Sequence, residues 1–225
     1  MISTQITSFI AGVVTIILLL CRRKRYDISV KVILAVFVIV GGIGYLGACV
    51  GAYFADSVFL GMRFYGKVVF VIFALWLIAS LFKIEKERIM DLYAPVDIFA
   101  LAIMKVNCMI FGCCGGITLC ISEDCNDIVF PSQMFEFAVA LTIGITILLL
   151  ERNKKYDYIK YPFYLLSYGT TRYFFDFFRE DKGKTFYIGN YYITCAQLFC
   201  IVIIIFGLLF LVKEIKRRKL IKEAN

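Results

Sequence analysis

Long apolar stretches recur along the whole chain and constrain its fold more than any other feature. Hydrophobic residues make up 61% of the 225 residues, and charged residues make up 19%. An average soluble domain is about 45–50% apolar and about 25% charged, so this chain cannot hide its apolar surface in one soluble core. A membrane-spanning helix needs roughly 20 residues. The sequence therefore predicts a polytopic membrane protein built from helices.

Seven such stretches can be drawn, and they form a single membrane domain over residues 1–225. We expect an all-α integral membrane protein with seven transmembrane helices and no separate soluble domain. The segment 41–48, in the outer half of the second stretch, is rich in small residues, which should let a neighbouring helix approach closely. The expected spans are 6–21, 30–54, 67–82, 92–111, 133–150, 158–178 and 191–212.

Lysine and arginine residues gather beside alternate ends of these stretches, which predicts the orientation of the chain. One set of connections carries the basic run 22–25, the segments 83–88 and 152–160, and the tail after residue 212. The other set is poor in basic residues, and its segment 117–132 is acidic. Because cytoplasmic loops are enriched in Lys and Arg, the N-terminus is expected outside and the C-terminus in the cytoplasm.

The net charge of +8 fits this membrane interpretation. Basic loops are attracted to anionic lipid at the membrane surface, and no soluble basic domain is expected that would bind nucleic acid. The basic run 22–25 follows the first apolar stretch, whereas a signal peptide carries its charges in front. We therefore expect a retained first span in a multi-pass protein.

The absence of histidine excludes several kinds of active site. Ser-His-Asp and Cys-His catalysis, HExxH zinc sites and histidine-bound haem all require this residue. A proton acceptor in this chain must be a carboxylate, Lys, Tyr, Cys, the backbone or water.

The sixth stretch carries a polar stripe at membrane depth. Tyr168, Arg172, Asp176 and Arg179 fall within about 80° of one another on a helix. One interpretation is an internal Arg172–Asp176 pair that makes the helix tolerable in lipid, with Arg179 reaching water. The other is a binding site, because Asp176 neutralises only one arginine and a second on the same face suits an anion such as phosphate.

Other polar side chains are expected at the same depth. Lys105 lies in the outer half of the fourth span, where it is either a site residue or a lysine that reaches the membrane surface. Gln133 and Glu136 lie one turn apart at the start of the fifth span, as site residues or as an exposed first turn. Tyr65 lies between two cations before the third span, where an aromatic belt is the alternative. Together these groups predict one cavity with cationic walls that faces the outer leaflet and binds an anionic phospholipid head group.

Four of the nine cysteines cluster after the fourth span, at Cys113, Cys114, Cys120 and Cys125. Their spacing lacks the paired CxxC pattern of common zinc and iron–sulfur sites. A loop disulfide or apolar packing is expected instead, with no metal and no cofactor. Four more lie within spans and are expected in the core: Cys21, Cys49, Cys195 and Cys200.

The polar segments resemble those of the prolipoprotein diacylglyceryl transferases. The similar segments are 61–66, 91–95 with 105–116, 130–136 and 168–180, and their order and spacing match from about residue 40 to the end. The resemblance implies seven spans with the orientation given above, in a bacterial cytoplasmic membrane. It also implies lipoprotein biosynthesis, in which a diacylglyceryl group passes from phosphatidylglycerol to the lipobox cysteine of an exported prolipoprotein. Glycerol-1-phosphate leaves and a thioether forms.

The resemblance also suggests a role for individual residues. Arg172 and Lys105 would clamp the phosphate, Arg179 would guide the head group and Tyr168 would orient it. Tyr65 stands where the family has a histidine that is its proposed base. The remaining expected binding residues are Asp176, which would hold Arg172, and Gln133, Glu136, Gly112 and Gly116.

The chain departs from the family pattern at several positions. The family's arginine falls on Lys105, its asparagine on Cys108 and its glutamate on Cys113, and the chain is shorter than typical members, which carry a larger extracytoplasmic head region. Two other functions therefore stay open. One is a related transferase that uses another acceptor, and the other is a catalytically silent homologue that binds lipid or a partner.

Overall fold

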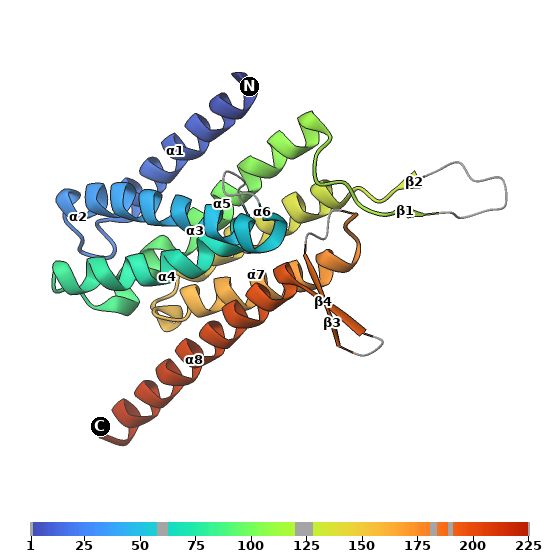
Figure 1. Ribbon diagram of the computed structural model, residues 1–225. Coiled ribbons are helices and arrows are strands. Elements are labelled where there is room, and N and C mark those ends of the chain that lie inside the picture. Colours follow the sequence, from blue (N-terminus) through green and yellow to red (C-terminus); the bar gives the residue numbers. More distant parts are fainter. Residues whose placement is uncertain (1, 58–62, 120–127, 181–183, 189–190, 225) are drawn as a thin grey trace.

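The computed structural model describes residues 2–57, 63–119, 128–180, 184–188 and 191–224 of the chain (Figure 1). Helices make up most of this part, as the apolar stretches predict. The helical elements are α1 (Ile2–Arg22), α2 (Val30–Ala35), the π-helical turn η1 (Val36–Val40), α3 (Gly41–Asp56), α4 (Phe64–Leu81), α5 (Lys86–Phe111), α6 (Ser132–Glu151), the 3₁₀ turn η2 (Lys154–Tyr156), α7 (Lys160–Phe177) and α8 (Cys195–Ala224).

The expected all-α class is confirmed, and two short antiparallel hairpins add to the helices. In the first, β1 (Thr118–Leu119) pairs with β2 (Ile128–Val129), and in the second, β3 (Thr185–Ile188) pairs with β4 (Tyr191–Thr194). Both hairpins lie at the same end of the helical bundle, while α8 runs to the opposite end (Figure 1). This arrangement separates a hairpin end from an end that carries the C-terminus.

Six helices in the described part are long and apolar enough to cross a membrane: α1, the continuous α2–η1–α3 helix, α4, α5, α6 and α8. The expected sixth span, α7, is not among them. Its tyrosines, threonines, Lys160, Arg172 and Asp176 make it too polar by composition. The bundle nevertheless buries one face of α7 against its neighbours, and the charged side chains Lys160, Arg172 and Asp176 lie on that buried face.

The seventh predicted span begins later than expected, because residues 191–194 form strand β4. Thr194 and Gln197 explain the boundary. The Gln197 backbone N–H donates to the Thr194 hydroxyl at 3.1 Å, and the Thr194 N–H donates to the Gln197 side-chain oxygen at 3.0 Å. This reciprocal pair is a capping box, which satisfies orphan backbone donors at a helix start. The helix α8 therefore starts at Cys195.

The small residues of α3 do allow the predicted close approach. A side-chain carbon added at Gly66 of α4 would lie 2.8 Å from the Gly51 Cα and would also collide with the Gly47 carbonyl. Lipid tails are as apolar as leucine, so tight contacts of this kind hold membrane helices together. Half of the residues in the apolar windows of both α4 and α5 are buried, which places these two helices at the centre of the bundle.

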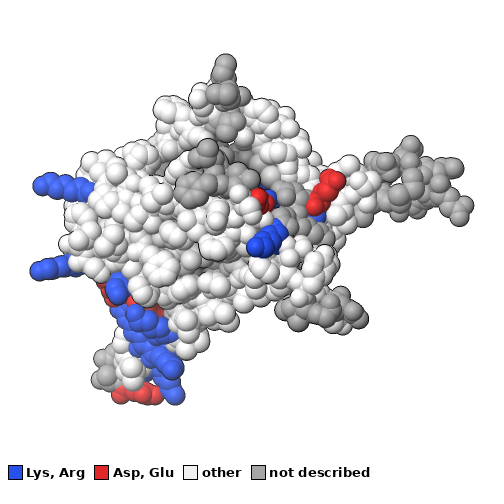
Figure 2. All heavy atoms as spheres, viewed as in Figure 1, with Lys and Arg blue, Asp and Glu red and all other residues white. Residues whose placement is uncertain are grey.

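Charged side chains are distributed unequally over the surface. Figure 2 shows Lys and Arg gathered toward the end at which α8 finishes, while most of the remaining visible surface is uncharged. The basic segments that separate the predicted spans account for this asymmetry. The acidic residues of 117–132 fall within 120–127, outside the described residues.

Candidate active site

The polar stripe predicted on the sixth stretch is present on α7 and just after it. Tyr168, Arg172 and Asp176 are buried on α7, and Arg179 is buried two residues beyond its end. Tyr168 stacks on Tyr164 with ring centres 6.1 Å apart. The stripe therefore faces the interior of the bundle, where each charge needs a partner.

A single carboxylate, that of Glu136 on α6, gathers the cations of the site. Its Oε1 accepts from Arg172 Nη1 at 3.2 Å and from Arg179 Nη1 at 3.1 Å. Its Oε2 forms an ion pair with the Lys105 ammonium group of α5. Glu136 and all three cations are buried. The structure thus brings four predicted site residues into one contact and contradicts the alternative that Lys105 reaches the membrane surface.

Arg172 lies between two carboxylates. Its Nη2 is 3.5 Å from Oδ1 of Asp176, one turn along α7, as the sequence predicts. The Thr194 hydroxyl donates to Oδ2 of Asp176 at 2.5 Å. Asp176 therefore links the guanidinium to the capped start of α8. The second partner, Glu136, lies on a different helix, so the periodicity of α7 does not reveal it.

The glycine-rich segment after α5 fixes the position of Arg179. Gly112 ends the helix in a left-handed conformation with φ 65°, which glycine adopts without strain. Gly116 pairs with the backbone of Arg179, and Ile117 N–H donates to the Phe178 carbonyl at 2.9 Å. A side chain at Gly116 would collide with Phe130, its Cβ lying 2.8 Å from that of Phe130. Both predicted glycines thus shape the site through the backbone.

Gln133 holds the segment after α5 by a hydrogen bond, and its described hydrogen bond does not involve the Glu136 carboxylate or its cations. Its side-chain amide donates to the Cys113 carbonyl at 2.8 Å, and the Ser132 hydroxyl donates to the Cys114 carbonyl at 2.9 Å. The first turn of α6 therefore holds the segment that follows α5. Only Glu136 of this helix reaches the cations.

Tyr65 is buried on α4, with its ring 5.1 Å from that of Phe199. Both neighbouring cations are held by carboxylates: Arg63 donates to Asp56 at 2.8 and 2.7 Å, and Lys67 Nζ lies 2.7 Å from Asp97. The two cations that flank Tyr65 in the sequence are therefore paired with carboxylates. The residue before Tyr65 does contact the site, because Phe64 packs edge-on against Tyr168.

A second buried polar cluster was missed in the sequence. Asp97 of α5 is fully buried and pairs with Lys67, and it accepts from the hydroxyls of Tyr93 at 3.2 Å and Tyr164 at 3.5 Å. An aspartate within an apolar span is a signal that could have revealed it. The cluster connects α4, α5 and α7 through side chains other than those of the Glu136 contact.

The space beside the cations is narrow. A cavity of about 20 Å³ lies between α5, α6 and α7, with Arg172, Glu136 and Tyr168 among apolar lining residues such as Leu101 and Phe175. About 10–15 Å³ is needed for one water molecule. The cavity formed by the described residues is therefore large enough for a water molecule and smaller than a lipid head group.

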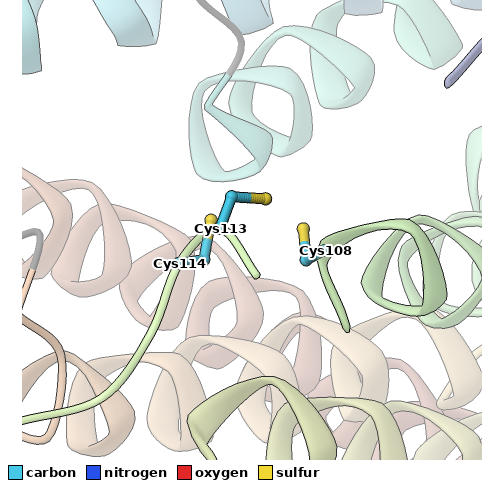
Figure 3. Close-up of side chains that lie close together, drawn as sticks. All are labelled: Cys108, Cys113 and Cys114. Carbon is cyan, nitrogen blue, oxygen red and sulfur yellow. The ribbon is translucent and has the colours of Figure 1, made fainter. Parts of the chain in front are cut away.

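The structure agrees with the prediction for some cysteines and differs from it for others. Cys49, Cys195 and Cys200 are buried as expected, whereas Cys21 is exposed. Cys120 and Cys125 lie outside the described residues. Cys108, at the end of α5, lies with Cys113 and Cys114, and their sulfur atoms are all within 4.8 Å of one another (Figure 3).

Curated relatives carry the names of lipid-transferring enzymes. The phosphatidylglycerol–prolipoprotein diacylglyceryl transferase of Chlorobaculum tepidum is 26% identical over 157 residues, which cover 66% of this chain and 54% of the relative. The protein of the same name from Pseudoalteromonas atlantica is 29% identical over 173 residues, or 71% of this chain and 61% of the relative. The Ehrlichia ruminantium protein of that name is 26% identical over 159 residues, which cover 66% of this chain and 61% of the relative. The chain spans less than two thirds of the length of each relative.

A family profile gives the broader match. The profile described as prolipoprotein diacylglyceryl transferase matches residues 4–213, which include Lys105, Glu136, Arg172 and Arg179. Nearly the whole chain, including the buried cationic contact, therefore lies within the matched region. The chain belongs to the prolipoprotein diacylglyceryl transferase family.

Proposed function

We propose that this protein transfers a diacylglyceryl group from phosphatidylglycerol to the lipobox cysteine of an exported prolipoprotein. The observation that carries the proposal is the convergence of Lys105, Arg172 and Arg179 on the Glu136 carboxylate. Two guanidinium groups and an ammonium group suit a phosphate, which offers more acceptor oxygens than a carboxylate. The names of the relatives supply the donor and the acceptor.

In this proposal the Glu136 carboxylate occupies the place of the lipid phosphate. Entry of phosphatidylglycerol displaces Glu136 from the arginines, and the phosphate takes over the hydrogen bonds from Arg172 and Arg179. The cavity of about 20 Å³ beside Arg172 supports this exchange, since it is smaller than a phosphate group needs. Buried cations are costly without a counter-charge, so the carboxylate stabilises the lipid-free state until the phosphate replaces it.

The reaction breaks one carbon–oxygen bond and forms one carbon–sulfur bond. The sulfur of the acceptor cysteine attacks the glyceryl carbon that carries the phosphate. The bonding electrons leave with the phosphate oxygen, and glycerol-1-phosphate departs. Arg172 and Lys105 stabilise the negative charge that grows on this leaving group, which is the kind of electrostatic help that lowers barriers most. Arg179 guides the head group, and Asp176 keeps Arg172 in place.

The acceptor thiol must also lose a proton. Tyr65 occupies the position of the family's histidine, and we assign it the role of relaying this proton to water: its hydroxyl oxygen accepts the thiol proton while its own proton passes to a water molecule. Its helix α4 contacts Tyr168 through Phe64, with ring centres 5.4 Å apart, which supports a place beside the lipid site. Tyr168 in turn orients the head group above Arg172.

The proposal includes a seven-span arrangement in a bacterial cytoplasmic membrane. An 18-residue helix such as α7 is about 27 Å long, close to the roughly 30 Å hydrocarbon core of a bilayer. The basic side chains at the end where α8 finishes support a cytoplasmic C-terminus (Figure 2). The N-terminus is then outside, and the Glu136 contact faces the outer leaflet.

A transfer assay with the purified protein tests the proposal. Labelled phosphatidylglycerol and a synthetic lipobox peptide should yield labelled peptide, and a peptide with serine in place of the lipobox cysteine should yield none. Release of glycerol-1-phosphate without labelled peptide would point to another acceptor. Neither product from phosphatidylglycerol, under conditions in which the protein binds that lipid, would show a silent lipid-binding homologue.

A further inference from the structure

Three cysteine sulfurs form a compact cluster at the end of α5. Cys108 projects from the last turn of the helix, and Cys113 and Cys114 come from the segment that follows (Figure 3). The three sulfur atoms all lie within 4.8 Å of one another. Three sulfurs at this separation can meet at one central atom.

The backbone holds the cluster in this arrangement. The left-handed turn at Gly112 reverses the chain, and Cys114 itself has φ 62°. For a residue other than glycine that conformation is uncommon. Hydrogen bonds from Gln133 and Ser132 fix the carbonyls of Cys113 and Cys114 from outside. Groups that orient ligands in this way are typical of metal sites.

Two cations lie near Cys114. The Arg179 guanidinium group and the Lys105 ammonium group are close enough to act electrostatically on its sulfur. A metal ion binds the thiolate form of cysteine, and neighbouring arginine and lysine stabilise that form. Cys113 is exposed, so an ion has a way in from the surface.

We propose that Cys108, Cys113 and Cys114 bind one Cu(I) ion through their three sulfurs. Thiolates are soft ligands that select Cu(I), zinc and iron–sulfur clusters. Structural zinc sites are almost always four-coordinate and iron–sulfur clusters use four cysteines, whereas the described part of the chain brings three sulfurs together. The site lies beside the proposed lipid site but takes no part in the transfer reaction. For Cys113 and Cys114 it is an alternative to the expected loop disulfide or apolar packing.

Metal titration of the purified full-length protein tests the proposal. The reduced protein is titrated with Cu(I) under anaerobic conditions against a competing Cu(I) chelator. We expect one Cu(I) per chain and sulfur-only coordination by X-ray absorption. Cys108→Ser and Cys114→Ser should each weaken binding by about tenfold or more, since even the loss of an outer partner typically costs 10–100-fold. Cys21→Ser, which alters an exposed cysteine outside the cluster, should bind as the parent does.

Three results would overturn the proposal. The first is unchanged Cu(I) affinity in Cys108→Ser, and the second is retention of Zn(II) in preference to Cu(I). The third is a stable disulfide within the cluster that leaves no Cu(I) binding before reduction or after it. Cys113→Ala is the second variant, because an exposed position tolerates truncation; loss of copper with an unchanged Tm separates ligand loss from unfolding. Copper binding is measured without lipid, so failure of the transfer assay does not affect it.

Discussion

Arg172 and Glu136 meet across two helices, with Arg172 Nη1 donating to Glu136 Oε1 at 3.2 Å. The pair is buried, and Arg179 and Lys105 join it through the same carboxylate. In the proposed function this contact is the resting state of a phosphate site. The carboxylate and the lipid phosphate then compete for the same cations.

Glu136→Gln tests this competition. The amide keeps the shape of the side chain but removes its charge, so the cations lose their counter-charge. Breaking a buried ion pair typically costs about 3–5 kcal/mol, and the variant should have a lower Tm in zwitterionic lipid. Phosphatidylglycerol should then raise the Tm by more than it does for the parent, because the phosphate no longer has to displace a charged group.

Thermal unfolding in nanodiscs with and without phosphatidylglycerol gives the Tm of each variant and the change in Tm that the lipid causes. Glu87→Gln is the matched control, since Glu87 pairs with Lys213 far along the chain and at a more exposed position. Its lipid response should equal that of the parent. An equal lipid response in Glu136→Gln would mean that the carboxylate does not occupy the phosphate position.

Gly116→Ala should disturb the site without touching a charged residue. The added methyl collides with Phe130, so the backbone that pairs with Arg179 must move. Overpacking of this kind costs about 1–3 kcal/mol, and transfer should fall because Arg179 shifts. Gly115→Ala is the control, as no atom of the described residues lies within 4 Å of the place that its methyl group would take. Equal activity and Tm in the two variants would contradict the role of Gly116 in positioning Arg179.

Tyr65→Phe removes one hydroxyl and keeps the ring that packs on Phe199. Stability should change by about 1 kcal/mol or less, whereas transfer should fall by roughly 10²–10⁴-fold if the hydroxyl handles the thiol proton. Tyr65→His should retain or raise the rate. Full activity in Tyr65→Phe would assign the proton to Glu136 or to water. Activity that appears only in Tyr65→His would identify the parent as a silenced family member.

Topology reporters test the shared leaflet that the proposal requires. Fusions after residues 25, 88 and 155 should report the cytoplasm, because basic segments mark that side. Fusions within 117–130 and 182–188 should report the outside. A cytoplasmic signal from 117–130 would place the Glu136 contact on the wrong side for an exported acceptor.

Patterns within one helix were readable from the sequence, and contacts between helices were not. The stripe of Arg172 and Asp176 follows from helical periodicity, and an ionisable residue in an apolar span marks Lys105 as a site candidate. The Glu136 contact depends on which faces of α5, α6 and α7 meet, and one chain's periodicity does not contain that information. The path of the backbone after Gly112, which brings Cys108 to Cys113, is equally non-periodic.

Other differences had a local signal. Thr194 and Gln197 have the spacing of a capping box, which marks the start of α8 in the sequence itself. Asp97 was visible as an acidic residue in an apolar span, yet its partners lie on three helices. Local signals therefore give the ends of helices and the candidates for buried charge, while tertiary packing decides how these charges pair.

Lipid transfer by Arg172→Ala, compared with the parent and with Arg172→Lys, tests the central claim most directly. The alanine variant removes the guanidinium group that Glu136 and Asp176 hold, and transfer from phosphatidylglycerol to a lipobox peptide should fall by about 10²–10³-fold, as for loss of one transition-state donor. Arg172→Lys should recover part of this loss, because it restores the charge but not the two-pronged geometry. Near-parental transfer by a folded, membrane-inserted Arg172→Ala protein would contradict the assignment of the phosphate site.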